Sequence, residues 1–256
     1  MDWKTNFRCL PNGLSDTMTV TSKELAGQVA LVTGSSRGIG EAIAESLAAR
    51  GAHVVITART AGGLEELEDR IHEAGGSATI APLDLTEGES IGKLAAAAAE
   101  RWPALDVLVL NAAMLGSLTP VEHIDPKEYA RVLTLNVVAN QALIAAFDPL
   151  LRKSEQAEVV AVTSSVGHEP RAFWGAYGSS KAALENLVLS YGDETEHSGK
   201  LRVHVIDPGA TRTRMRALAF PGEEPEDVKP PEAVARFILE RLASDAPTGE
   251  LVRVDS

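Results

Sequence analysis

Short apolar runs alternate along this chain with longer stretches in which apolar residues recur every three or four positions. Each short run has the length and composition of a buried strand, as in Val29-Ala30-Leu31-Val32-Thr33. Each longer stretch has the period of a helix with one buried face. The pattern predicts strands at 29–33, 53–57, 77–82, 107–110, 159–162, 203–206 and 251–254. It predicts helices at 39–50, 64–73, 87–102, 125–152, 177–196 and 231–243.

Two of the helix starts carry capping signals. Thr86-Glu87-Gly88-Glu89 has the form of a capping box, with Glu89 as the third helical residue. Asp125 precedes Pro126, an order in which Asp caps the helix and Pro occupies its first turn. We therefore expect side-chain caps at both places.

Strands and helices in strict alternation predict a parallel sheet with helices on both faces. Right-handed crossovers then give a doubly wound α/β Rossmann fold of about seven strands. Residues 23–256 contain no linker or repeat and are predicted to form one domain, with an irregular loop at about 212–229 that would cover a site. Residues 1–22 are polar and aperiodic, so we expect a disordered leader or a start site placed too early, with Met18 as a second Met.

Composition and charge exclude several classes of protein. The 256 residues are 45% hydrophobic and 23% charged, as in soluble globular proteins, and no apolar run approaches a membrane span. A formal net charge of −12 without a basic patch argues against nucleic-acid binding. The single cysteine, Cys9, and the lack of an apolar signal sequence predict a cytoplasmic protein. The histidines show no metal-ligand spacing, so no metal is predicted.

A glycine-rich turn joins the first predicted strand to the first helix. Its sequence is Thr33-Gly34-Ser35-Ser36-Arg37-Gly38-Ile39-Gly40. Glycines allow a tight turn and a close approach to a pyrophosphate, and the free N–H groups of the helix N-terminus attract an anion. A turn of this kind can also be purely structural, but its place between a strand and a helix favours nucleotide binding.

Tyr177 and Lys181 lie four residues apart, which is one turn on one face of a helix. An ammonium about 4 Å from a phenol, at an effective dielectric of about 20, favours the phenolate by roughly 4 kcal/mol. That is about three pKa units, enough to bring the pKa of Tyr177 near 7. With Ser164 thirteen residues upstream, the three side chains predict an acid–base centre for alcohol and carbonyl chemistry. An isolated pair of this spacing is usually a solvated helix face, so its context decides.

The Gly-x-x-x-Gly-x-Gly turn and Tyr177-x-x-x-Lys181 together resemble the short-chain dehydrogenase/reductase superfamily. The resemblance runs from about Leu25 to Val254. It also includes Asp84-Leu85, Asn111-Ala112-Ala113, Asn136 and Pro208-Gly209 followed by Thr213. Ala113 stands where the family usually has Gly, which adds one methyl group near the adenine ribose.

The resemblance implies a catalytic tetrad of Asn136, Ser164, Tyr177 and Lys181. Tyr177 would exchange a proton with the substrate oxygen, and Ser164 would hydrogen-bond that oxygen. Lys181 would lower the pKa of Tyr177 and bind the nicotinamide ribose, while Asn136 would hold a water that links Lys181 to solvent. Ser164 fits the family's spacing to both Tyr and Gly, and Ser165 is the alternative.

The resemblance also implies the cofactor contacts. They are Gly34, Ser36, Arg37, Gly38, Ile39, Gly40, Arg59, Asp84, Leu85, Asn111, Ala112, Tyr177, Lys181, Pro208, Gly209 and Thr213. A carboxylate after the second strand would bind the ribose of NAD, but this chain has Ala58-Arg59 there. Arg37 and Arg59 suit a 2′-phosphate, so NADP(H) is predicted over NAD(H).

The substrate walls are expected at 114–118, at 168–174 and in the loop that carries Met215, Leu218 and Phe220. Their side chains favour a small apolar or aromatic ketone or alcohol, and His168 is a candidate pocket residue. A 3-oxoacyl reductase is an alternative within the enzyme class, and a non-catalytic NADP-binding regulator is the alternative outside it. The resemblance also implies a homo-oligomer, a tetramer or dimer built on helices 127–152 and 177–196.

Overall fold

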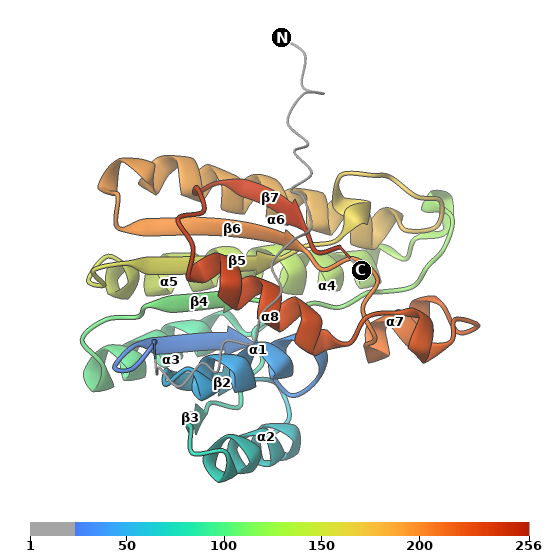
Figure 1. Cartoon of the computed structure of the whole chain (residues 1–256). Helices are drawn as coiled ribbons and strands as arrows, with labels where there is room; N and C mark the ends of the chain where they lie inside the picture. The colour runs from blue at the N-terminus through green and yellow to red at the C-terminus, as the bar shows by residue number, and fades with distance from the viewer. Residues whose placement is uncertain (1–23, 256) are drawn as a thin grey trace.

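The computed structural model describes residues 24–255 and contains one seven-stranded sheet (Figure 1). The predictions for residues 1–22 lie outside the described residues. All neighbouring strands are parallel, in the order β3-β2-β1-β4-β5-β6-β7. The strands are β1 Val29–Thr33, β2 His53–Thr57, β3 Ser77–Ile80, β4 Val107–Leu110, β5 Ala157–Val162, β6 Leu201–Asp207 and β7 Glu250–Arg253. The predicted doubly wound parallel sheet is therefore confirmed.

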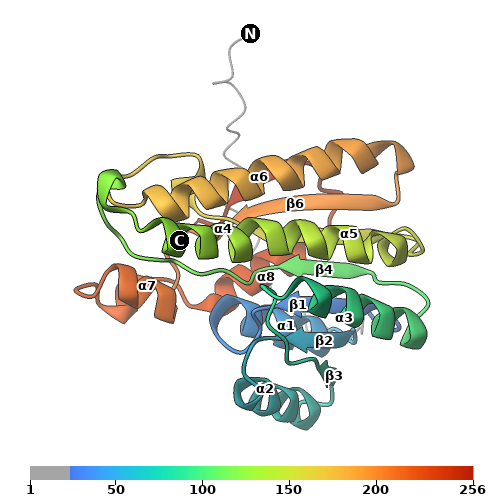
Figure 2. The ribbon, with the colours of Figure 1, turned by 180° about the vertical axis from the view of Figure 1, so that it is seen from behind.

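Helices cover both faces of this sheet, as the two opposite views show (Figure 1, Figure 2). The helices are α1 Gly38–Ala49, α2 Gly62–Glu73, α3 Gly88–Arg101, α4 Pro126–Leu133, α5 Ala139–Leu151, α6 Gly175–Thr195, α7 Arg214–Ala219 and α8 Pro231–Leu242. Buried residues of α3, α5 and α6 share one core with the sheet, and those of α1, α2 and α8 share the other.

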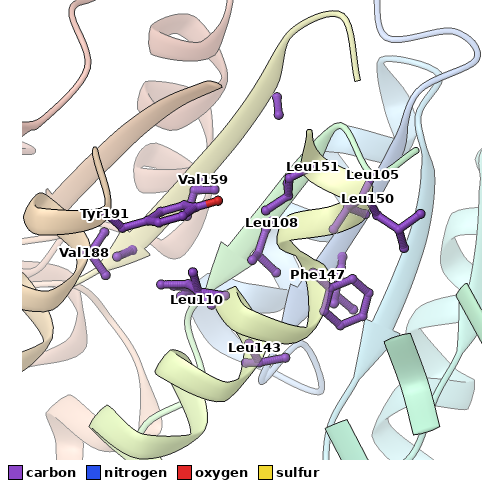
Figure 3. Close-up of a cluster of buried hydrophobic side chains, with 14 of the residues drawn as sticks. Leu105, Leu108, Leu110, Leu143, Phe147, Leu150, Leu151, Val159, Val188 and Tyr191 are labelled. Atoms are coloured by element: carbon purple, nitrogen blue, oxygen red, sulfur yellow. The ribbon is translucent and has the colours of Figure 1, made fainter. Parts of the chain in front are cut away.

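The strands β1 and β4 in the middle of the sheet are buried along their whole length, which explains why their sequences are almost entirely apolar, whereas the edge strands β3 and β7 are partly exposed. In β1, for example, Val29 and Leu31 belong to one core, and Ala30 and Val32 belong to the other. Figure 3 shows part of the first core, where Phe147 from α5 lies among leucines of α5, β4 and the turn before β4. Burial of this kind stabilises the fold by roughly 25 cal/mol per Å² of apolar surface.

The predicted helix over 125–152 is interrupted by one π-helical turn, Thr134–Val138, between α4 and α5. The predicted Asp125 cap is confirmed, because its carboxylate accepts a 2.9 Å bond from the Lys127 amide. By length and composition, residues 126–151 could cross a membrane. However, the inner side of α5 forms part of the core beside α3, which is the position of a core helix in a globular protein.

Two local predictions were wrong. The capping box at Thr86 does not form, because the Thr86 amide and hydroxyl both donate to Asp84 Oδ1. Helix α3 consequently begins at Gly88, with Glu87 at its N-cap and no side-chain cap. The stretch 212–229 is not irregular throughout, since it contains α7, which is capped by Thr213, and a short 3₁₀ turn at Pro225–Asp227.

Candidate active site

A cavity of about 910 Å³ opens at the carboxyl ends of the central strands. Loops that follow β1, β2, β4, β5 and β6 all line it, together with the start of α6 and most of α7. In doubly wound sheets this edge is where ligands bind, because the strand order reverses there and leaves a crevice.

The glycine turn after β1 is held against the loop after β4. The Asn111 side-chain amide donates to Thr33 O at 2.9 Å and to Gly34 O at 3.2 Å. Gly34 has a φ of +65° and lies so close to Ala112 that a Cβ would stand 2.9 Å from the Ala112 Cα. Glycine is therefore required there, and Asn111 fixes the shape of the turn as well as lining the cavity.

Gly40 differs from its neighbours in the turn, because it does not line the cavity. A Cβ at this position would lie 2.4 Å from Asn111 Nδ2 and 2.6 Å from Gly34 O. Gly40 thus allows α1 to pack against the turn, whereas Gly34, Ser36, Arg37, Gly38 and Ile39 face the space where the sequence predicts a pyrophosphate.

Two arginines line the cavity in the loops that follow the adjacent strands β1 and β2, and we call this part of the cavity its basic end. Arg37 and Arg59 line it, and neither makes a salt bridge with any residue in the described range 24–255. Ala58 and Thr60, which flank Arg59, also line the cavity and carry no charge. These residues fit the 2′-phosphate of NADP, since two guanidiniums are free to donate to it.

A third arginine at this end, Arg70 of α2, was not recognised from the sequence. Its Nε donates to Glu45 at 2.8 Å, and its Nη2 pairs with Glu41. Glu41 also accepts a 3.0 Å bond from the Gly38 amide, so this carboxylate sits at the start of α1. Arg70, Glu41 and Glu45 all line the cavity, and the positive charge of Arg70 partly neutralises the two carboxylates there.

Tyr177, Lys181 and Ser164 line the other part of the same cavity. Tyr177 and Lys181 come from the first turns of α6 and are buried, and Ser164 follows β5. Lys181 Nζ donates to Val162 O at 2.8 Å and lies 5.7 Å from the centre of the Tyr177 ring. Ser165 begins a 3₁₀ turn and does not line the cavity, so the geometry favours Ser164 over its alternative.

The expected lowering of the Tyr177 pKa is not found. Burial raises the pKa of the Tyr177 phenol well above its usual range, and the nearby Asp207 carboxylate adds to the effect. Burial also lowers the pKa of Lys181 to about 8, although Glu185 opposes this change. The estimate from sequence failed because it counted the attraction between the two groups and omitted the loss of solvent around both of them.

Asn136 and Asp84, two further predicted site residues, lie outside the cavity lining. Asn136 sits in the π-helical turn, where its side chain bonds both backbone groups of Met114 and the Ser180 hydroxyl, each at 2.9 Å. The backbone carbonyl of Asn136 accepts a 2.8 Å bond from the Asn140 side-chain amide. Asn136 therefore ties the loop after β4 to α6, and its role in a proton relay stays a prediction.

The loop after β6 also lines the cavity. Pro208, Gly209 and Thr213 line the cavity, and a Cβ on Gly38 would lie 3.4 Å from the Thr213 methyl group. Thr213 also accepts a 3.1 Å bond from the Arg216 amide, which caps α7. The predicted cofactor residues Leu85 and Ala112 line the cavity as well.

Aromatic side chains gather beside Tyr177. The ring centre of Trp174 lies 6.1 Å from that of Tyr177 and 5.7 Å from that of Phe220. Trp174 and Met215 line the cavity, but the side chain of Leu218 is exposed and His168 points to Glu185 instead. The expected role of His168 in the pocket is therefore not supported.

The comparisons with known proteins agree with this geometry. Residues 28–224 match the family model of the short chain dehydrogenases. The oxidoreductase YciK of Escherichia coli K12, whose activity is uncharacterised, is 37% identical over 225 residues, which are 87% of this chain and 88% of YciK.

Solved structures show the same fold. A protein of Pseudomonas syringae described as a short chain dehydrogenase superposes with a TM-score of 0.89 at 38% identity, over 95% of this chain and all of that one. A similarly described protein of E. coli CFT073, solved with NADPH, gives a TM-score of 0.87 at 36% identity, over 92% of this chain and 100% of that chain. The chain therefore belongs to the short-chain dehydrogenase/reductase family of oxidoreductases.

Proposed function

We propose that this protein transfers a hydride between NADP(H) and the carbonyl or alcohol group of a small, apolar substrate. The observation that carries the proposal is that Ser164, Tyr177 and Lys181 line the same cavity as the glycine turn and the free Arg37 and Arg59. Nucleotide-binding groups and acid–base groups thus face one space, which hydride transfer requires and simple nucleotide binding does not.

In this proposal NADPH supplies the hydride, and the protein's own residues handle the proton. Burial keeps the Tyr177 hydroxyl protonated at neutral pH, so it can donate to the carbonyl oxygen during reduction. Ser164 donates a hydrogen bond to the same oxygen and stabilises the charge that develops on it. Lys181 places a positive charge near the Tyr177 ring. It also lines the cavity, where in this proposal it binds the hydroxyls of the nicotinamide ribose.

The preference for NADP(H) rests on charge at the basic end of the cavity. Binding of NADPH and NADH, measured by quenching of tryptophan fluorescence, should show tighter binding of NADPH. Arg59→Asp should weaken NADPH binding by about 100-fold and should not weaken NADH binding, because only NADPH carries the phosphate and a carboxylate at this position can bind the ribose of NAD. Equal or tighter binding of NADH by the wild-type protein would refute the preference.

The wall beside Tyr177 favours an apolar substrate, because Trp174 and Met215 line the cavity and Phe220 packs on Trp174.

We also propose a homo-oligomer. Val138, at the junction of the π turn and α5, is 57% exposed although it is a large apolar residue, and a second copy would cover it. Light scattering after gel filtration tests this part, and a monomer at micromolar concentration would contradict it.

A further inference from the structure

A buried carboxylate lies behind Ser164. Glu185 is one helical turn after Lys181 on α6, and only 7% of it is exposed. Its Oε1 accepts a 2.5 Å bond from the Thr163 hydroxyl and a 3.2 Å bond from His168 Nδ1. Thr163 directly precedes Ser164, and His168 follows the 3₁₀ turn Ser165–Gly167. One carboxylate oxygen therefore holds both ends of the segment that carries Ser164.

The packing between this segment and α6 leaves no spare room. A Cβ on Gly167 would lie 2.5 Å from Glu185 Oε1 and 3.2 Å from the Ala182 amide nitrogen. The segment also closes on itself, since the Gly167 amide donates to Ser164 O at 2.8 Å and the Glu169 amide donates to Ser165 O at 2.7 Å. The carboxylate, the glycine and the turn thus fit together as one unit.

Burying a carboxylate costs free energy unless the carboxylate is hydrogen-bonded, so a buried carboxylate such as Glu185 indicates a specific role for its hydrogen bonds. Thr163 lines the cavity beside Ser164, whereas Glu185 and His168 do not. Glu185 is therefore placed to act on the cavity through its bond to Thr163 and not by direct contact with a ligand.

We propose that Glu185 is a positioning residue that fixes the Ser164 hydroxyl in the cavity through its bonds to Thr163 and His168. This inference rests on the proposed function only in the role given to Ser164. The bonds predict that an amide at position 185 can replace the carboxylate, because a Gln side-chain oxygen also accepts from a hydroxyl and from an imidazole N–H.

Hydrogen exchange of the backbone amides tests the positioning without any substrate. Glu185→Met keeps the size of the side chain and removes the acceptor, and it should speed exchange at Gly167 and Glu169 by about tenfold or more. Glu185→Gln should stay within about threefold of the wild-type protein. Glu194→Met, an exposed acidic residue on the same helix, is the matched control and should have no effect on these amides.

Unchanged exchange at Gly167 and Glu169 in Glu185→Met would overturn the proposal. If Glu185→Met does not fold, Thr163→Val removes one of the two bonds and leaves the carboxylate paired with His168. It should speed exchange of the same amides by about threefold, and unchanged exchange would again refute the inference.

Turnover of the best ketone from a substrate panel tests whether the effect reaches Ser164. Glu185→Met should lower kcat by about tenfold and leave the Kd of NADPH within about threefold, and Glu185→Gln should restore most of kcat. In a Ser164→Ala background, Glu185→Met should lower kcat by less than about twofold. Equal losses in both backgrounds would show that Glu185 does not act through Ser164. A wild-type protein that reduces no ketone would refute the proposed function, while the exchange result would still decide the positioning.

Discussion

Lys181 and Tyr177 are both buried, with the ammonium nitrogen 5.7 Å from the centre of the phenol ring. Burial disfavours the charged form of each group, so the pKa of Tyr177 rises and that of Lys181 falls to about 8. The Tyr177 hydroxyl therefore stays protonated at neutral pH and can donate its proton, which suits the reduction of a carbonyl.

The lowered pKa of Lys181 predicts how stability depends on pH. The unfolded chain keeps the proton up to the ordinary value of 10.5, whereas the folded protein loses it near 8. Between these values the unfolded state binds more protons, so the free energy of unfolding rises with pH, by about 3 kcal/mol from this group.

Lys181→Met removes this dependence. Urea unfolding of both proteins from pH 7 to 10.5 should show the wild type gaining about 3 kcal/mol relative to the variant. A constant difference across this range would mean that burial does not shift the Lys181 pKa. The variant is also expected to lose turnover.

Gly40 should tolerate no side chain. Gly40→Ala places a methyl group against Gly34 O and the Asn111 amide, and it should lower the free energy of unfolding by about 2 kcal/mol or more. Gly62→Ala is the matched control, since Gly62 also lies in the first turn of a helix and a Cβ added there would have no atom within 4 Å. This control should be neutral or stabilising by about 0.5 kcal/mol. Equal losses in urea unfolding would contradict the packing described for Gly40.

Arg70 should affect NADPH more than NADH. Arg70→Met leaves Glu41 and Glu45 uncompensated at the basic end of the cavity, where they would repel the 2′-phosphate. The Kd of NADPH should rise about tenfold at low salt and less at 1 M salt, because added ions screen exposed charges. Arg236→Met, on the exposed side of α8, is the control. Equal changes for NADPH and NADH would show that Arg70 acts on the fold and not on the phosphate.

The sequence predicted all seven strands, with the observed bounds for β1, β2 and β4 and with bounds one to two residues off for the others. The bounds are clearest where a strand is buried on both faces and leaves a continuous apolar run, such as 107–110. The spacing of Ser164, Tyr177 and Lys181 and the order of the motifs also predicted that these three side chains lie in one site. These signals are either local in the chain or depend on the order of the elements, and both kinds can be read from the sequence alone.

Other features could not be predicted because they depend on packing between distant segments. The pKa of Tyr177 depends on burial, which spacing cannot show. Arg70 meets Glu41 and Glu45 only when α2 packs beside α1. Glu185 offered one signal, its position one turn after Lys181, but its partners Thr163 and His168 come from another segment.

The most direct test of the account is the oxidation of NADPH against a panel of apolar and aromatic ketones by the wild-type protein and by Tyr177→Phe. The substitution removes only the hydroxyl that is proposed to donate the proton. The account predicts that the variant loses at least about 100-fold in kcat, because proton transfer by a positioned side chain contributes about that much or more. NADPH binding should stay within about threefold of wild type, since the ring is kept. Turnover that is unchanged in Tyr177→Phe would remove Tyr177 from the mechanism and contradict the central claim.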